Sequence, residues 1–98
     1  MLKKTLSKNG KTYRVTFTVP AGAGAQEIHL CGEFNEWDEN SHPLKQRQDG
    51  RFSTTVTLEA GRSYRYRYLF DGERWENDEA ADAYMPNPFG GDDSVVQL

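Results

Sequence analysis

The sequence predicts an all-β protein, an antiparallel sandwich of six to seven short strands. Three observations support this class. Apolar and polar residues alternate with period two through most of the chain. Turn signals at Asp49-Gly50, Ala60-Gly61 and Asp71-Gly72 separate the alternating runs. No stretch has the apolar spacing of a helix, and residues 79–84 would form one short turn at most. Short strands between turn signals favour a sandwich of the immunoglobulin type.

The first half of the chain is expected to hold two strands and a short edge strand. Tyr13, Val15, Phe17 and Val19 alternate with polar residues, and Pro20 ends that run. The expected elements are a strand over 13–19, a small-residue loop over 21–25, a strand over 28–32, a polar loop over 33–43 and an edge strand over 43–45.

The second half is expected to hold three more strands, over 52–58, 64–70 and 94–98. In the strand over 64–70, tyrosines and a phenylalanine line one face, so Arg67 lies on the other. Residues 76–93 are acidic and rich in proline and glycine, which is typical of a loop. The aromatic residues expected in the core are Tyr13, Phe17, Phe52, Tyr64, Tyr66, Tyr68 and Phe70.

Length and charge limit the possible functions. The 98 residues suffice for one domain, spanning 1–98, and the formal charge of −3 argues against nucleic acid or an anionic membrane as a partner. One cysteine, no apolar run of membrane-spanning length and no signal peptide pattern lead us to expect a cytoplasmic protein. Residues 71–98 hold 8 acidic side chains and one basic one. This surplus indicates either a binding face or a solvated acidic loop.

Catalytic and metal-binding patterns are missing from the sequence. The two histidines, His29 and His42, have no evident nucleophile partner, and pairing of His29 with Cys31 is less favoured than simple packing in a sheet. No zinc, calcium or phosphate-binding spacing occurs, so we expect neither a metal nor a cofactor. Carboxylate pairs suited to glycoside hydrolysis are unavoidable among 15 acidic residues, but no enclosing cleft is expected. The sequence therefore predicts a protein that is not an enzyme.

Two tryptophans stand in polar, turn-rich segments. Trp37 lies within residues 33–39 and Trp75 within residues 71–78. An indole offers a flat apolar face and one N–H donor, which complements the C–H face and hydroxyls of a sugar ring. The residues alone leave two roles open for each tryptophan, stacking on a ligand or closing the core.

Several segments resemble a known family. Residues 28–37 read IHLCGEFNEW, and residues 49–52, 66–72 and 86–96 read DGRF, YRYLFDG and PNPFGGDDSVV. In this order they resemble the strand, the G-x-F-N-x-W loop and the later motifs of the family 48 carbohydrate-binding modules, over about residues 12–98. That family includes the N-terminal early-set domains of isoamylase and glycogen-branching enzymes and the glycogen-binding domain of the AMP-activated protein kinase β subunit. The chain looks most like small bacterial stand-alone versions, which carry a glycoside hydrolase family 13 label without a catalytic barrel.

The resemblance implies an immunoglobulin-like early-set sandwich that binds α-1,4-linked glucan. It places two sugar-stacking tryptophans at Trp37 and Trp75, and a lysine that hydrogen-bonds sugar hydroxyls at Arg67. A loop leucine falls on Phe89, which would add stacking area. An asparagine falls on Asp93, which accepts hydrogen bonds but cannot donate them. A threonine falls on Gly91, so its side-chain contact is lost.

Two further functions stay open at this point. The departures at Gly91 and Asp93 and the acidic surplus also fit an interaction or regulatory domain that keeps the fold but has lost sugar binding. A true hydrolase is the weakest reading. Under the favoured reading the partners are glycogen, starch or a maltooligosaccharide, and an enzyme of glucan metabolism.

Overall fold

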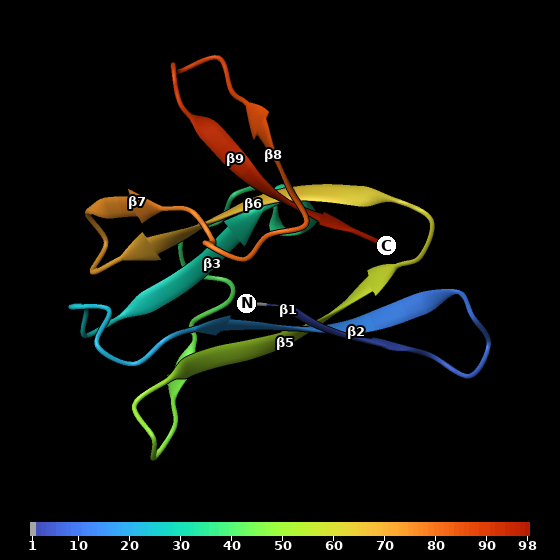
Figure 1. Ribbon diagram of the computed structural model, residues 1–98, viewed down its shortest axis with the longest axis horizontal. Helices are drawn as coiled ribbons and strands as arrows, with labels where there is room; N and C mark the ends of the chain where they lie inside the picture. The colour runs from blue at the N-terminus through green and yellow to red at the C-terminus, as the bar shows by residue number, and fades with distance from the viewer. Residues whose placement is uncertain (1) are drawn as a thin grey trace.

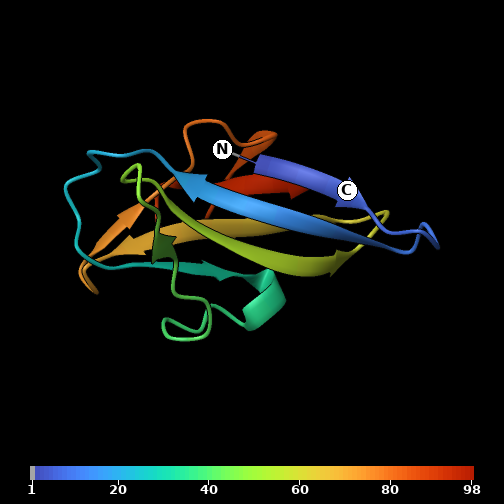
Figure 2. The same cartoon turned by 90° about the horizontal axis from the view of Figure 1, so that it is seen from below.

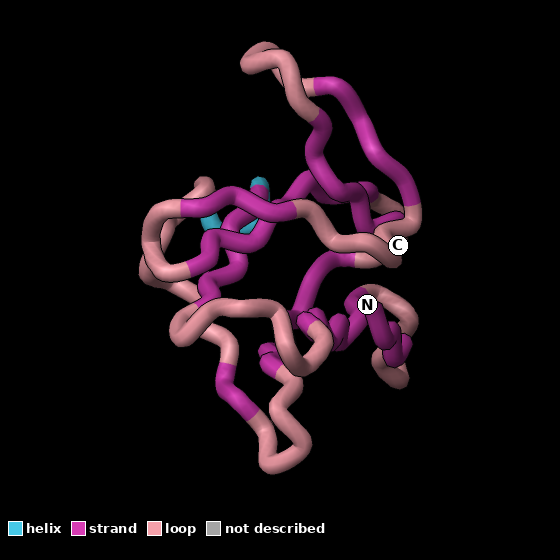
Figure 3. The backbone as a smooth tube through the Cα atoms, turned by 60° about the vertical axis from the view of Figure 1, so that its left-hand side comes forward, coloured by secondary structure: helices cyan, strands magenta, loops and turns pink. Residues whose placement is uncertain are grey.

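The computed structural model describes residues 2–98, which form two antiparallel sheets facing each other (Figure 1). The architecture is the predicted immunoglobulin-like sandwich, with one short 3-10 helix, η1, among the described residues (Figures 2 and 3). The elements are β1 (Leu2–Leu6), β2 (Thr12–Val19), β3 (Ile28–Gly32), η1 (Glu33–Asn35), β4 (Lys45–Gln46), β5 (Phe52–Glu59), β6 (Ser63–Phe70), β7 (Arg74–Glu76), β8 (Ala83–Pro86) and β9 (Asp92–Gln97). No helix in residues 2–98 is long and apolar enough to cross a membrane.

One sheet has the strand order β1-β2-β5-β4, and the other has the order β3-β6-β9-β8. In the second sheet, β6 pairs with β3 along one side. Along its other side β6 pairs first with β9, at residues 63–66, and then with β7, at residues 68–70. The β8–β9 hairpin stands out from the body of the sandwich (Figures 1 and 3). This arrangement puts β7 and the hairpin on the same long edge of β6.

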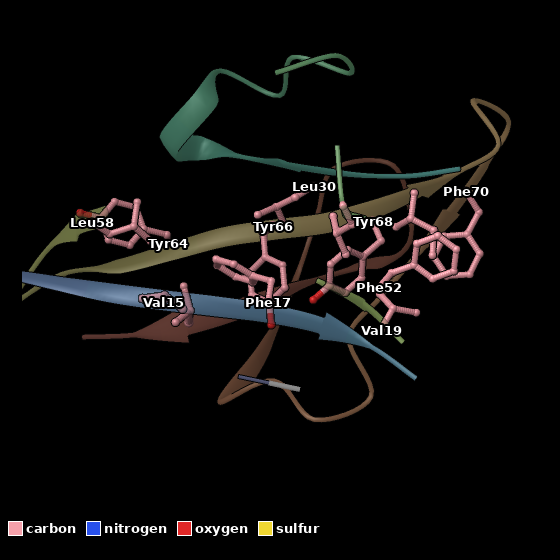
Figure 4. Packing of buried hydrophobic residues seen from close by; sticks show 13 residues of the cluster. Val15, Phe17, Val19, Leu30, Phe52, Leu58, Tyr64, Tyr66, Tyr68 and Phe70 are labelled. Atoms are coloured by element: carbon pink, nitrogen blue, oxygen red, sulfur yellow. The ribbon is translucent and has the colours of Figure 1, made fainter. Parts of the chain in front are cut away.

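The core lies between the sheets and is built from the alternating positions of their strands (Figure 4). Phe17 of β2 meets Tyr66 of β6 edge to face, with ring centroids 5.0 Å apart. The aromatic residues predicted in the core are all buried except Tyr13, which is half-buried against it. The period-two alternation therefore predicted the inner faces correctly.

A carboxylate, Asp78, is buried beneath this core with only 3 % of its surface exposed. Its Oδ2 accepts hydrogen bonds from the hydroxyls of Tyr66, at 2.8 Å, and Tyr68, at 3.2 Å. Its backbone N–H donates to Ser94 Oγ, and its backbone oxygen accepts from the Tyr84 hydroxyl. Burial, together with this neighbouring carboxylate, raises the pKa of both Tyr66 and Tyr68 well above the ordinary value.

Three strands were not predicted, so the described chain has more strands than the six or seven expected. The alternation pattern predicts no strand over β1, and β7 and β8 fall in segments predicted to be turns or loops. Residues 79–84 are not helical, because the chain turns there and enters β8. The expected edge strand over 43–45 begins two residues later, at Lys45. The last strand pairs within the chain, with β6 and β8.

Candidate functional site

A hollow of about 600 Å³ opens on the face of the β3-β6-β9-β8 sheet that points away from the core. Register defines this face. Tyr66, Tyr68 and Phe70 of β6 point into the core, so the alternate residues Arg67 and Leu69 point outward. The hollow is lined by Trp37, Glu39, Arg67, Trp75, Asn87, Pro88, Phe89 and Asp93. Three separate segments therefore build it: the loop after η1, the β6–β7 pair and the β8–β9 hairpin.

The β6–β7 pair supplies Arg67 and Trp75. Trp75 lies opposite Leu69 in register, so its indole falls on the same outward face, with 37 % of its surface exposed. The guanidinium carbon of Arg67 lies 5.9 Å from the centre of the Trp75 ring, within the range of a cation–π contact. Arg67 Nε is buried and has no hydrogen-bond partner among the described residues. The two side chains form a flat polar and aromatic wall.

The loop after η1 supplies Trp37. Gly32 ends β3 at a point where an added Cβ would lie 2.7 Å from the backbone oxygen of Arg65 and 2.7 Å from the Phe34 ring. Only glycine fits so close an approach. The chain then turns through Glu36 and Trp37, both with left-handed backbone angles, φ 55° and 58°. The backbone N–H of Trp37 donates to the backbone oxygen of Gly32 at 2.9 Å and closes this turn. The half-buried indole of Trp37 then lines the hollow.

The β8–β9 hairpin supplies Phe89 at its tip, where 92 % of the residue is exposed. Asn87 holds the loop around it. The Asn87 Oδ1 accepts from the N–H groups of Phe89, at 3.0 Å, and Gly91, at 3.2 Å, and the Asn87 N–H donates to the Gly91 oxygen at 2.8 Å. This loop therefore presents an apolar ring to solvent on a backbone fixed by hydrogen bonds.

Asp93 lines the hollow but is largely used within the protein. Only 6 % of the residue is exposed. Its Oδ1 accepts from Asn87 Nδ2 at 3.2 Å, and its Oδ2 forms an ion pair with Arg65 at 3.4 Å. Arg65 also donates to the backbone oxygen of Pro86 at 3.2 Å. The Asp93 carboxylate thus ties the base of the hairpin to β6.

The remaining charges at the hollow are Glu39, which is exposed, and Arg67. Cys31 lies opposite Arg67 in register and is fully buried. Burial raises the pKa of the Cys31 thiol to about 11, with smaller contributions from Glu39 and Asp38. The thiol therefore stays neutral and unreactive at ordinary pH. Within residues 2–98, no three histidine, cysteine or acidic side chains gather closely enough to hold a metal ion.

All five residues suggested by the sequence line this one hollow: Trp37, Trp75, Arg67, Phe89 and Asp93. Arg67 has the outward orientation that the alternation of side chains along residues 64–70 predicted. Sequence reasoning missed three lining residues, Glu39, Asn87 and Pro88. Asn87 and Pro88 stand in the quoted PNPFGG motif and could have been found there, whereas Glu39 carries no motif signal. The part each residue plays in binding stays a prediction.

Comparison with known protein families identifies the family of this chain. Residues 5–85 match the model of "Carbohydrate-binding module 48 (Isoamylase N-terminal domain)". The chain belongs to this family. Membership places it among carbohydrate-binding modules, and modules of this one family typically form part of branching enzymes of the glycoside hydrolase 13 group.

Curated relatives point the same way. The chain is 36 % identical over 73 residues to the 1,4-alpha-glucan branching enzyme GlgB of Aquifex aeolicus, covering 74 % of this chain and 11 % of that enzyme. It is 39 % identical over 61 residues to the enzyme of the same name from Halothermothrix orenii, covering 62 % and 9 %. It is 35 % identical over 51 residues to the 1,4-alpha-glucan-branching enzyme of Dictyostelium discoideum, covering 52 % and 7 %. The chain thus spans about a tenth of the length of these relatives.

Proposed function

We propose that this module binds α-1,4-linked glucan in the hollow, with aromatic side chains as stacking platforms. The observation that carries the proposal is the meeting of Trp37, Trp75 and Phe89 at one hollow from three separate segments. Exposed aromatic rings gathered at one place usually serve a partner, and a flat ring matches the C–H face of a pyranose. The α-1,4 linkage follows from the relatives, which are named for acting on 1,4-alpha-glucan.

The polar groups suit a neutral, hydroxylated ligand. Arg67 supplies hydrogen-bond donors and Glu39 supplies acceptors, and both stand at the rim without an ion-pair partner among the described residues. Each stacking contact contributes about 1–3 kcal/mol, by analogy with bases on aromatic rings. Hydroxyl groups exchange water for protein, so each hydrogen bond adds only about 1 kcal/mol. We therefore expect a dissociation constant in the micromolar to millimolar range, which suits a module that gains from many sites on a polymer.

Asp93 has two roles in this proposal. Its carboxylate anchors the hairpin through Asn87 and Arg65, and its remaining lone pairs accept a sugar hydroxyl at the floor of the hollow. The first role fixes where Phe89 stands relative to Trp75. The second is minor, because only 6 % of the residue reaches solvent.

We further propose that the module is non-catalytic and serves an enzyme of glucan metabolism. Acid–base cleavage of a glycosidic bond needs two carboxyl groups on either side of that bond. The carboxylates at the hollow are Glu39 on an exposed loop and Asp93, whose oxygens are held by Arg65 and Asn87. The curated relatives carry a segment of this kind within a much longer branching enzyme.

Electrophoresis in native gels with and without glycogen tests the proposal. The wild-type protein should be retarded by glycogen, and Trp37→Ala and Trp75→Ala should each relieve most of that retardation while remaining folded. Migration of the wild-type protein that is identical with and without glycogen would contradict sugar binding. That result would favour the alternative hypothesis of an interaction domain that has lost sugar binding, which the acidic segment over residues 71–98 also fits.

A further inference from the structure

Asn35, the last residue of η1, makes three side-chain hydrogen bonds beside Trp37. Its Oδ1 accepts from the Gly32 N–H at 2.9 Å. Its Nδ2 lies 2.9 Å from the Leu30 carbonyl oxygen and 2.8 Å from Nδ1 of His42. One amide therefore joins the end of β3, η1 and the returning chain at His42.

These partners fix the direction of every bond. A backbone N–H can only donate and a carbonyl oxygen can only accept, so Asn35 must turn its oxygen to Gly32 and one amide hydrogen to Leu30. The second amide hydrogen then points at His42. For that contact to be a hydrogen bond, Nδ1 of His42 must carry no proton. The arrangement thus requires a neutral imidazole with its hydrogen on Nε2.

The same side-chain amide holds the backbone turn that leads into Trp37. Asn35 is followed by Glu36 and Trp37, two successive residues in the left-handed region, a conformation that costs energy in non-glycine residues. The backbone N–H of Trp37 donates to the backbone oxygen of Gly32, and the backbone N–H of Asp38 donates to the backbone oxygen of Asn35 at 3.1 Å. Such backbone angles persist only where surrounding contacts hold them. The hydrogen bonds of Asn35 are those contacts on its side of the loop.

We propose that His42 is a positioning residue for the sugar platform of Trp37, acting through Asn35, and that it performs this role only as a neutral imidazole. The inference rests on the proposed function of Trp37 as a platform. Protonation of His42 places an N–H of the ring against an N–H of Asn35, and a flip of the amide only moves the same conflict to Gly32 and Leu30. Glucan binding therefore weakens when His42 gains a proton.

The groups around His42 come from its own loop, from η1 and from β3. Asp38, in the same loop, is fully exposed, and its pKa is lowered by the Asn40 N–H first, then by the Ser41 hydroxyl and more weakly by His42. From η1, the Phe34 ring meets the imidazole edge to face, with ring centroids 6.2 Å apart. The Glu33 carboxylate, also from η1, accepts a hydrogen bond from the backbone N–H of Arg65. From β3, Leu30 is apolar and the Cys31 thiol is neutral.

Titration with maltoheptaose at about pH 8 and about pH 6 tests the inference, since the protein stays above its isoelectric point near 5.3 at both. Wild-type protein should bind at least about threefold more weakly at the lower pH, the effect of one lost and opposed hydrogen bond at partial protonation. His42→Asn places an acceptor oxygen where Nδ1 stands and should bind equally at both values. His29→Asn, the matched control on the other histidine, should keep the wild-type pH dependence. Equal wild-type binding at both values, or an equally pH-sensitive His42→Asn, would overturn the role of His42.

A measurement without sugar separates this inference from the proposed function. The chain has two tryptophans, so in Trp75→Ala protein the single indole N–H signal in an NMR spectrum belongs to Trp37. That signal should shift with the same midpoint as the His42 ring protons, and it should stay constant when His42→Asn is added. A Trp37 signal that ignores the titration of His42 would overturn the positioning role. Absence of sugar binding at about pH 8 would instead overturn the proposed function and leave this spectrum to decide on His42.

Discussion

Replacing Phe89 with alanine separates binding from folding. Phe89 is 92 % exposed, so folding removes less than a tenth of its surface from water. A phenylalanine side chain of roughly 200 Å² then loses only about 16 Å², which at about 25 cal/mol per Å² is about 0.4 kcal/mol. For a protein of this size that cost lowers the melting temperature by no more than about 4 °C.

The loss of binding should be much larger than the loss of stability. If Phe89 stacks on a glucose ring, its removal costs about 1–3 kcal/mol of binding free energy, which is about a 5- to 150-fold rise in the dissociation constant. The hydrogen bonds of the loop come from Asn87 and backbone groups, so they survive the substitution. The change therefore removes the ring and leaves its support in place.

Calorimetric titration with maltoheptaose and thermal unfolding of the same samples measure the two quantities. Leu6→Ala is the matched control, because Leu6 is also an exposed apolar residue, 53 % accessible, but lies on β1 outside the hollow. It should leave the dissociation constant unchanged. A dissociation constant for Phe89→Ala within twofold of wild type would refute the stacking role. A loss of more than about 1 kcal/mol of stability would refute the claim that the ring contributes little to the fold.

Three further predictions concern the sandwich. Asp78→Asn deprives either the Tyr66 and Tyr68 hydroxyls or the backbone N–H of Ala80 of a carboxylate acceptor. The free energy of unfolding, measured in urea, should fall by about 1.5–3 kcal/mol. An unchanged urea midpoint would contradict this. Gly32→Ala drives a Cβ to 2.7 Å from a backbone oxygen of β6 and should cost about 1–3 kcal/mol, seen as a lower melting temperature. Folding raises the pKa of Cys31, Tyr66 and Tyr68, so their contribution to stability is complete below the ordinary values of 9.0 and 10.0 and is lost as the pH rises beyond them. The urea midpoint should therefore stay level from pH 7 to 9 and fall by pH 11, and a rise over that interval would show that the sign is wrong.

The long strands could be predicted from the sequence because one of their faces is buried and the other is not. In β2, β5 and β6 this difference makes apolar and polar residues alternate with a period of two, which is visible in a few consecutive residues of the sequence. β1 shows no such contrast, because four of its five residues are exposed and it forms by pairing with β2. β7 is three residues long and exists because it continues the edge that β9 leaves on β6. Such strands depend on tertiary pairing and leave little local signal.

The candidate site could be predicted only in part. Parity placed Arg67 on the outward face, and the polar surroundings of Trp37 and Trp75 singled them out. Their convergence with Phe89 depends on the pairing of β6 with β7 and β9, which no local pattern contains. The link between Asn35 and His42 was hidden for the same reason, since it is formed by the path of the loop between them.

Tryptophan fluorescence during titration with maltoheptaose is the decisive test of α-glucan binding in the hollow, because both indoles of the chain line it. We expect a saturable change in emission at micromolar to millimolar maltoheptaose, and no change with cellohexaose, whose β-1,4 linkages give a straight chain. An emission spectrum that stays constant with maltoheptaose up to several millimolar would contradict the assignment of this surface to α-glucan.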